Sequence, residues 1–229
     1  MTGYVFQPAP QPAVAIAGGG FFPVRRIFCI GRNYSEHVKE MGGDPKAEPP
    51  VFFTKPADAV IESGAVVPYP PATENLHYEG ELVVALKEGG RNIASPEAAR
   101  RLIFGYAAGC DLTRRDLQAA AKKNGLPWDA AKAFDNSAPV GAIMPIEDAG
   151  DLGAARLSLS VNGEPRQAAA LAEMIWPVPE IIIALSQQFE LKAGDLIFTG
   201  TPSGVGPLER GDKVDVTIGA LPALAFEIA

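Results

Sequence analysis

The sequence predicts an α+β fold in which many short strands are joined by a few helices. Apolar runs of strand length recur along the chain, and the capped helical segments between them are few. A doubly wound parallel sheet would instead show strands that alternate regularly with helices. The 229 residues suffice for one large domain with a substantial core.

The chain is predicted to divide into an N-terminal arm, residues 1–24, and a folded body, residues 25–229. The first segment is rich in Pro, Gly and Ala, which predicts an N-terminal arm with one or two edge strands rather than core. The second segment contains no linker-like stretch, so we expect it to form a single domain.

Short apolar runs predict the strands of this domain. The run at residues 77–86 does not alternate apolar with polar residues, which predicts a largely buried strand. Asn162-Gly163 after residues 157–161 is typical of a two-residue hairpin turn. Further strands are predicted at residues 27–31, 51–55, 58–61, 196–199, 214–218 and 223–228.

Capping residues predict the helices. Ser95 is the predicted N-cap of a helix, because serine is favoured at that position and the proline that follows is favoured at the first helical position. Thr113 to Asp116 forms a variant capping box whose helix ends at Gly125. Residues 179–188 begin with proline and favour a helix, although their β-branched run leaves a strand open.

Composition and charge exclude several classes of protein. The 47% apolar content is ordinary for a globular domain, and no apolar run approaches the length of a membrane span. A net charge of −7 with scattered basic pairs leaves no basic stripe for nucleic acid. The acidic balance would also repel a small anionic substrate at long range, so such a substrate needs cations within its site.

The N-terminus lacks the basic segment of a secretory signal, so the expected location is the cytoplasm. Cys29 and Cys110 both lie in apolar segments, where we expect buried thiols rather than a disulfide.

Glu79 and Glu81 open the buried run at residues 77–86. Residues two apart on a strand share a face, and neighbouring carboxylates at the edge of a core need solvent or a cation to compensate them. Asp111 ends another apolar segment and is the candidate third ligand. Three carboxylates suit Mg²⁺ or Mn²⁺ better than zinc. The alternative is a solvated strand face, which the lack of alternation disfavours.

His37 and Glu40 lie three apart within a predicted short helix over residues 33–41, so they share one face of it. A carboxylate beside an imidazole raises its basicity, which allows the imidazole to activate a water molecule. The glycines that follow would let this helix act as a lid over a site. The alternative is a chance pair on a polar surface helix.

Candidate substrate contacts are basic side chains and one glycine turn. Lys132 has mostly apolar neighbours and could neutralise a substrate oxyanion, although most lysines only extend to solvent. Arg32 and Arg115 are candidate forks for a carboxylate. The turn that begins with Gly200 and Thr201 could bring backbone N–H groups and a hydroxyl to a carboxylate, or it could be a plain turn between strands.

Taken together, these segments resemble the fumarylacetoacetate hydrolase family from about residue 27 to the C-terminus. The resemblance is closest to its small branch that cleaves acylpyruvates, and the arm is similar to that of bacterial fumarylpyruvate hydrolases. Several separate motifs stand in the right order, namely residues 31–34, 37–41, 55–56, 77–81, 105–113 and 200–206, and Lys132.

The resemblance implies a mixed β-sandwich roll with a short lid helix, a single catalytic domain over residues 25–229, and a homodimer. It also implies the roles of individual residues. Positions matching Glu79, Glu81 and Asp111 bind Mg²⁺ or Mn²⁺, and those matching His37 and Glu40 form a dyad on the lid. The substrate pocket is lined by positions that match Arg32, Gln118, Lys132 and Thr201.

The function expected from these features is metal-dependent hydrolysis of a carbon–carbon bond in a 2,4-diketo acid, with fumarylpyruvate preferred, as in aromatic catabolism. Two alternatives use the same scaffold: decarboxylation or tautomerisation of oxaloacetate, and isomerisation of hydroxymuconate-type diacids. A remote alternative is a non-catalytic binding protein in which the carboxylates hold a structural ion.

Overall fold

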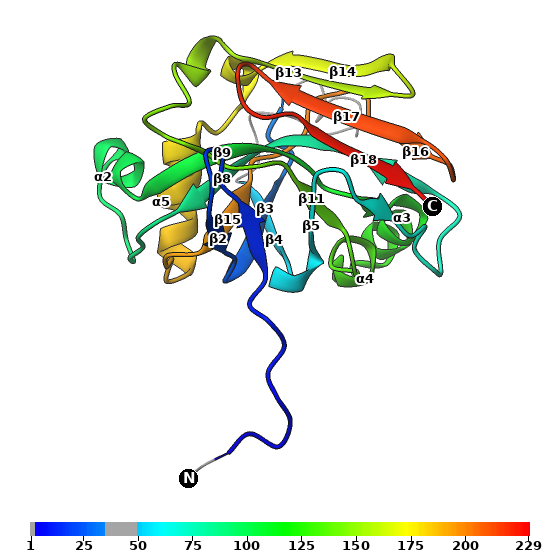
Figure 1. Cartoon of the computed structure of the whole chain (residues 1–229), viewed down its shortest axis with the longest axis horizontal. Helices are drawn as coiled ribbons and strands as arrows, with labels where there is room; N and C mark the ends of the chain where they lie inside the picture. Colours follow the sequence, from blue (N-terminus) through cyan, green and yellow to red (C-terminus); the bar gives the residue numbers. More distant parts are fainter. Residues whose placement is uncertain (1–2, 35–49) are drawn as a thin grey trace.

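The computed structural model describes residues 3–34 and 50–229 of the chain. A large mixed sheet runs through the centre, a second sheet stacks across one face of it, and helices lie to either side (Figure 1). This arrangement confirms the predicted α+β class and the predicted stacking of mixed sheets.

The large sheet has eight strands within the described residues, in the order β4-β3-β15-β8-β9-β11-β5, with β12 paired to β9. Their bounds are β3 (Arg26–Gly31), β4 (Val51–Lys55), β5 (Val60–Glu62), β8 (Gly80–Leu86), β9 (Ile103–Cys110), β11 (Ala138–Val140), β12 (Met144–Pro145) and β15 (Asp195–Phe198).

Three smaller sheets complete the strands of the described part. The five-stranded sheet, in order, is β14 (Glu164–Ala170), β13 (Arg156–Val161), β17 (Lys213–Ile218), β18 (Leu224–Ile228) and β6 (Val66–Val67). The three-stranded sheet is β10 (Thr113–Arg114), β7 (Leu76–Tyr78) and β16 (Gly206–Leu208), and β1 (Ala13–Ala15) pairs with β2 (Phe21–Pro23).

Short helices connect these strands. They are α2 (Pro96–Arg101), α3 (Arg115–Asn124), α4 (Asp129–Lys132) and α5 (Val178–Gln188), with 3₁₀ turns η1 (Ala57–Ala59), η2 (Leu152–Ala154) and η3 (Leu171–Glu173). None of the helices in the described residues is long and apolar enough to cross a membrane.

The central strand β8 is buried on both faces, which explains why its sequence does not alternate. Leu82 packs into the core between the two large sheets, while Val84 packs against helix α5 through residues such as Ile181. On the opposite face, Val83 joins the cluster that contains Phe198. All seven residues of the strand are buried, so apolar side chains are needed on both sides.

Most predicted elements are confirmed. Ser95 caps helix α2, and its hydroxyl accepts a hydrogen bond from the backbone N–H of Ala98 at 3.2 Å. Asn162 and Gly163, with φ of 53° and 79°, connect the antiparallel strands β13 and β14. The ambiguous segment at residues 179–188 lies in helix α5, whose apolar face packs on the large sheet.

Two predictions were wrong in detail. Thr113 is not an N-cap, because it lies in strand β10 and its hydroxyl accepts a hydrogen bond from Nζ of Lys132. Helix α3 begins at Arg115 without a side-chain cap. The prediction that residues 1–24 stay outside the core fails for Val14 and Phe22, which are buried in the cluster beneath the large sheet. Residues 3–10 extend away from the body (Figure 1).

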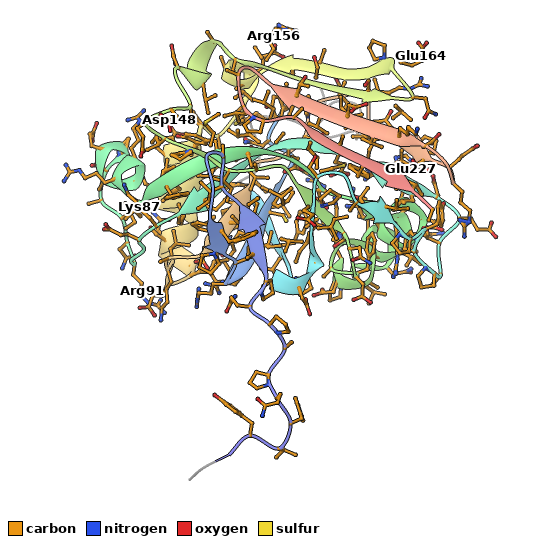
Figure 2. All side chains as sticks on the ribbon, viewed as in Figure 1. Lys87, Arg91, Asp148, Arg156, Glu164 and Glu227 are labelled. Atoms are coloured by element: carbon orange, nitrogen blue, oxygen red, sulfur yellow. The ribbon has the colours of Figure 1, made fainter. Side chains whose placement is uncertain are left out.

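Charged side chains gather on the outside of this body. Lys87, Arg91 and Glu164 are exposed and point outward in Figure 2. Among the described residues, the buried charged side chains other than Asp195 belong to the site described below.

Gly109 allows the strands behind the site to pack closely. A Cβ atom at this position would lie 2.4 Å from Cγ2 of Val83 and 3.0 Å from Cε1 of Phe198. We expect Gly109→Ala to lower the free energy of unfolding by about 1–3 kcal/mol through overpacking. Urea denaturation measures this change, with Gly3→Ala as the control because its Cβ would contact nothing within 4 Å. Equal stability of the two variants would contradict the packing argument.

Candidate active site

Three acidic side chains meet where strand β8 begins and strand β9 ends. The antiparallel register pairs Gly80 with Cys110, which places Glu79 beside Asp111. The backbone N–H of Asp111 donates to the carbonyl of Glu79 at 2.8 Å and fixes this position. Glu79, Glu81 and Asp111 each offer a carboxylate oxygen, and these three atoms lie within 4.8 Å of one another.

Lys132, at the end of helix α4, connects two of these carboxylates. Its Nζ atom donates to Oε2 of Glu79 at 2.8 Å, to Oδ2 of Asp111 at 2.7 Å and to the hydroxyl of Thr113 at 2.6 Å. These contacts use all three of its protons. Burial acts to lower the pKa of Lys132, but the nearby charges of Asp111 and Glu79 raise it overall, so the amine stays charged.

Two further cations balance the cluster. The Nζ atom of Lys55, from strand β4, lies 2.8 Å from Oδ1 of Asp111. Arg115, the first residue of helix α3, lies with Nη2 2.5 Å from Oε1 of Glu79, and its Nη1 donates to Oε1 of Gln118 at 2.6 Å. The buried acidic cluster is therefore held by basic side chains from three separate elements.

Glu81 is the carboxylate of this cluster for which the described residues supply no ion pair. Its Oε2 accepts a hydrogen bond from the backbone N–H of Gly200 at 2.7 Å, and no ion pair with a described lysine or arginine is formed. Burial raises the pKa of Glu81 well above its usual value, and the negative charges of Asp111 and Glu79 raise it further. A cation placed between these groups would favour the charged form.

The cluster fits a hard divalent cation. Its ligand atoms are all oxygens, and the side chains are buried, at 6% exposure for Glu79, 2% for Glu81 and 0% for Asp111. Oδ1 of Asp111 accepts no hydrogen bond from the described residues, although Lys55 lies close to it. A set of buried carboxylate oxygens from three residues suits Mg²⁺ or Mn²⁺.

The turn after strand β15 contacts the carboxylate cluster through a backbone N–H. Gly200 has a φ of 97°, and a Cβ atom there would lie 2.7 Å from Cβ of Asn33, so only glycine fits. The carboxylate that its N–H meets is that of Glu81. The hydroxyl of Thr201 donates to the carbonyl of Gly80 at 2.9 Å and accepts from Nε2 of Gln167 at 2.8 Å.

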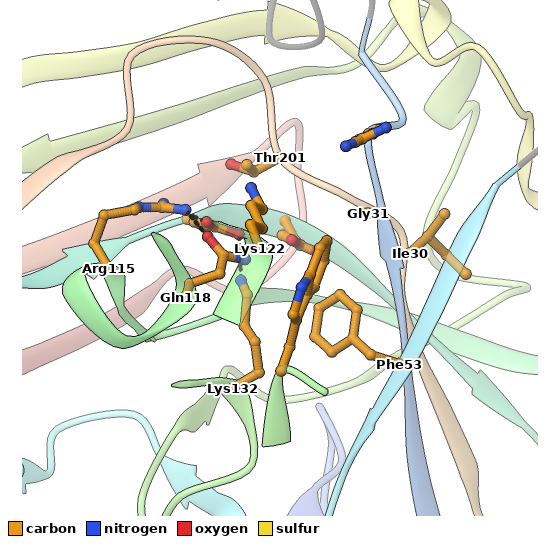
Figure 3. A pocket seen from close by; sticks show the side chains of 12 residues that line it. Ile30, Gly31, Phe53, Arg115, Gln118, Lys122, Lys132 and Thr201 are labelled. Atoms are coloured by element: carbon orange, nitrogen blue, oxygen red, sulfur yellow. Dashed lines mark hydrogen bonds and ion pairs between the residues drawn. The ribbon is translucent and has the colours of Figure 1, made fainter. Parts of the chain in front are cut away.

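One pocket brings most of the predicted site residues together (Figure 3). Its lining contains Arg32, Glu79, Glu81, Arg115, Gln118, Lys132 and Thr201. Asp111 lies behind this surface with no exposure, and Gly200 reaches the site through its N–H on Glu81. His37 and Glu40 lie outside the residues that the structure describes, and so does most of the predicted lid helix.

The pocket also contains residues that the sequence did not indicate. Ile30, Gly31, Phe53, Lys122 and Trp128 complete its lining. The signal for Lys122 was its spacing, since it follows Gln118 by four residues and therefore shares a face of helix α3. Phe53 and Trp128 gave no such signal, because their rings meet, with centroids 5.9 Å apart, only through the packing of strand β4 near helix α4.

Comparison with known proteins agrees with this geometry. Residues 26–229 match the family model described as fumarylacetoacetate (FAA) hydrolase C-terminal. The crystal structure of fumarylpyruvate hydrolase from Pseudomonas aeruginosa, in complex with Mn²⁺ and pyruvate, is similar with a TM-score of 0.96 and 46% identity, covering 99% of both chains.

Two curated proteins have a different activity in their names. The mitochondrial oxaloacetate tautomerase FAHD1 of Mus musculus is 45% identical over 205 residues, which are 89% of this chain and 91% of that protein. The oxaloacetate tautomerase YcgM of Escherichia coli (strain K12) is 45% identical over 197 residues, 86% of this chain and 89% of that protein.

Substitution of Glu81 separates metal binding from folding. Glutamine keeps an acceptor for the N–H of Gly200 but removes one of three mutually repelling buried charges. We expect Glu81→Gln not to lower the Tm of EDTA-treated protein, yet to weaken Mn²⁺ binding by more than about tenfold, the loss that follows even when a partner of a metal ligand is removed.

Isothermal calorimetry and thermal unfolding with and without Mn²⁺ measure the two effects. Glu164→Gln, on the exposed hairpin, is the matched control. Unchanged Mn²⁺ affinity together with a large loss of Tm in EDTA would make Glu81 a structural residue and not a metal ligand.

Proposed function

This chain belongs to the fumarylacetoacetate hydrolase family, and we propose that it is a divalent-metal-dependent acylpyruvate hydrolase whose preferred substrate is fumarylpyruvate. The observation that carries the proposal is the buried cluster of Glu79, Glu81 and Asp111, which opens into a pocket lined with cationic side chains. Such a pocket suits an anionic 2-oxo acid that reacts through an enolate.

The similarity to the Pseudomonas aeruginosa enzyme supports hydrolysis in particular. Mn²⁺ and pyruvate are bound in that protein, and pyruvate is the product that every acylpyruvate hydrolysis releases. The structural match covers 99% of this chain and 99% of that enzyme, at 46% sequence identity. The structural likeness thus includes nearly the whole chain.

The proposed reaction adds water to the C4 carbonyl of the substrate and breaks the bond between C3 and C4. His37, oriented by Glu40, takes a proton from the water, and C3 leaves as an enolate carbon that is then protonated to give pyruvate. The charge of Lys132 stabilises the oxyanion formed at C4. A bound Mg²⁺ or Mn²⁺ would supply a Lewis acid worth several kcal/mol of charge stabilisation in the transition state.

Remaining contacts would position the substrate. Arg115 and Gln118 are joined by a hydrogen bond and face the pocket from helix α3, so they can hold a carboxylate or carbonyl oxygen near the cluster. Arg32 and Thr201 line the pocket from the ends of strands β3 and β15. The N–H of Gly200 would act indirectly, by orienting Glu81.

Oxaloacetate tautomerisation is the second candidate, favoured by the 45% identity to proteins with that name. It moves a proton within the substrate and needs the same cationic pocket, but it adds no water. Decarboxylation of oxaloacetate and isomerisation of hydroxymuconate-type diacids would use the pocket in the same way. A purely structural ion is the remaining alternative, and it leaves the cationic lining without a role.

Assembly and location stay predictions from the sequence. We propose a homodimer in the cytoplasm, with a small anionic keto acid as the ligand and without nucleic acid or membrane partners. The place of the reaction in aromatic catabolism follows from the choice of fumarylpyruvate as substrate, and it is tested by the same assay.

Substrate choice can be tested directly. We expect pyruvate release from fumarylpyruvate to exceed release from maleylpyruvate, acetylpyruvate and oxaloacetate when Mg²⁺ or Mn²⁺ is present, and to cease with EDTA. Pyruvate production followed by a coupled dehydrogenase assay measures this, and loss of enol absorbance reports tautomerisation of oxaloacetate in parallel. Pyruvate from oxaloacetate alone, or tautomerisation alone, would overturn the hydrolase proposal.

His37 is predicted to matter for water activation. We expect His37→Ala to lower the rate of fumarylpyruvate hydrolysis by about 10²–10⁴, the usual contribution of a general base. Steady-state kinetics measure this change, and Glu36→Gln is the neighbouring control. A variant that retained nearly full hydrolysis would show that the dyad assignment is wrong.

A further inference from the structure

Lys122 is a pocket cation that no carboxylate of the described residues neutralises. Its side chain lines the same pocket as Glu79 and Lys132, and Figure 3 shows its amine in the pocket below Thr201. Its Nζ atom lies 5.0 Å from the ring centroid of Trp128, a cation–π contact, and forms no ion pair with an acidic side chain of residues 3–34 and 50–229.

We infer that Lys122 and the adjacent face of Trp128 form a subsite for the second carboxylate of a substrate, away from the cluster of Glu79, Glu81 and Asp111. The pocket would then select 2-oxo acids with two carboxylates. This inference rests on the proposed function, because it assumes that a 2-oxo acid occupies the pocket. It goes further because it assigns recognition of the distal end of that acid to Lys122, which lies outside the carboxylate cluster.

The other cations near the cluster are engaged. All three protons of Lys132 are donated to Glu79, Asp111 and Thr113, and Lys55 lies against Asp111. Arg115 is shared between Glu79 and Gln118. A substrate carboxylate that met only these groups would compete with the protein's own carboxylates. Of the two lysines among the described residues that line the pocket, Lys122 can accept an anion without such competition.

The surroundings of Lys122 favour an incoming anion. Partial burial lowers the pKa of Lys122 to about 8, and the positive charge of Arg115 adds to this effect. An anionic group beside the amine would offset both effects and restore its charged form. Trp128 supplies an apolar wall that shields the ion pair from water and so strengthens it.

Helix geometry separates this subsite from the cluster. Arg115, Gln118 and Lys122 follow one another by three and four residues and form one stripe on helix α3. At a rise of about 1.5 Å per residue, Lys122 lies roughly 10 Å along the helix from Arg115, which contacts Glu79 of the carboxylate cluster. A ligand could therefore place one carboxylate near Arg115 and the other near Lys122.

Two ligands of equal length provide the test. 2-Oxoglutarate and 2-oxopentanoate differ only in the terminal group, a carboxylate against a methyl group. With Mn²⁺-loaded protein, we expect calorimetry to show that 2-oxoglutarate binds about 10- to 100-fold more tightly, the range expected for one charged hydrogen bond. Lys122→Met should remove most of this preference while leaving the affinity for 2-oxopentanoate within about threefold.

Matched variants control for general effects of charge and folding. Lys123→Met removes the next lysine, which is exposed and does not line the pocket, and it should keep the preference. Lys122→Arg should keep it as well. Lys122→Gln provides a second neutral variant if Lys122→Met fails to fold, and thermal unfolding checks each protein.

Turnover gives a second readout. In Lys122→Met we expect kcat/KM to fall about 10- to 100-fold for fumarylpyruvate but by less than about threefold for acetylpyruvate, which has no distal carboxylate. Equal losses for both ligands of either pair, or an unchanged preference, would overturn the inference. If the protein does not hydrolyse acylpyruvates, the calorimetric pair still tests the subsite, so the two failures are distinguishable.

Discussion

The structure depends on the compensation of buried carboxylate charge at the edge of the large sheet. Glu79, Glu81 and Asp111 lose most of their hydration there, and each buried charge would cost several kcal/mol without a partner. Lys132 and Arg115 compensate Glu79, and Lys132 and Lys55 compensate Asp111. These cations come from helices α3 and α4 and from strand β4, so the folding of those elements onto the sheet is coupled to the site.

The packing of the sheet also sets the positions of the carboxylates. Strand β8 is packed on both faces, and its pairing with β9 sets the separation between Glu79 and Asp111. At Gly200 and Gly109 neighbouring groups approach so closely that an added Cβ atom would not fit. The carboxylates are thus held near one another despite their repulsion, which is the preorganisation that a divalent ion requires.

Charge also connects the cluster with the substrate. The protein carries a net charge of −7, which opposes the approach of an anion, yet the pocket gathers Arg32, Arg115, Lys122 and Lys132. In the proposed enzyme the long-range repulsion is overcome locally by these side chains and by the bound metal. The same pocket would serve hydrolysis or tautomerisation, because both reactions build negative charge on a 2-oxo acid, and the choice depends on whether water is activated.

The sequence by itself determined the α+β class, the buried run at residues 77–86, and Glu79, Glu81 and Asp111 as candidate ligands, because continuous apolar runs and the spacing of polar residues within them are visible in the local sequence. Only the tertiary structure decided that Gly200 binds Glu81, that Thr113 contacts Lys132 instead of capping a helix, and that Lys55, Lys122 and Trp128 belong to the site. These contacts join residues from separate elements, and no local pattern records which distant side chains a fold brings together. The roles of His37 and Glu40 rest on their spacing and on the family resemblance.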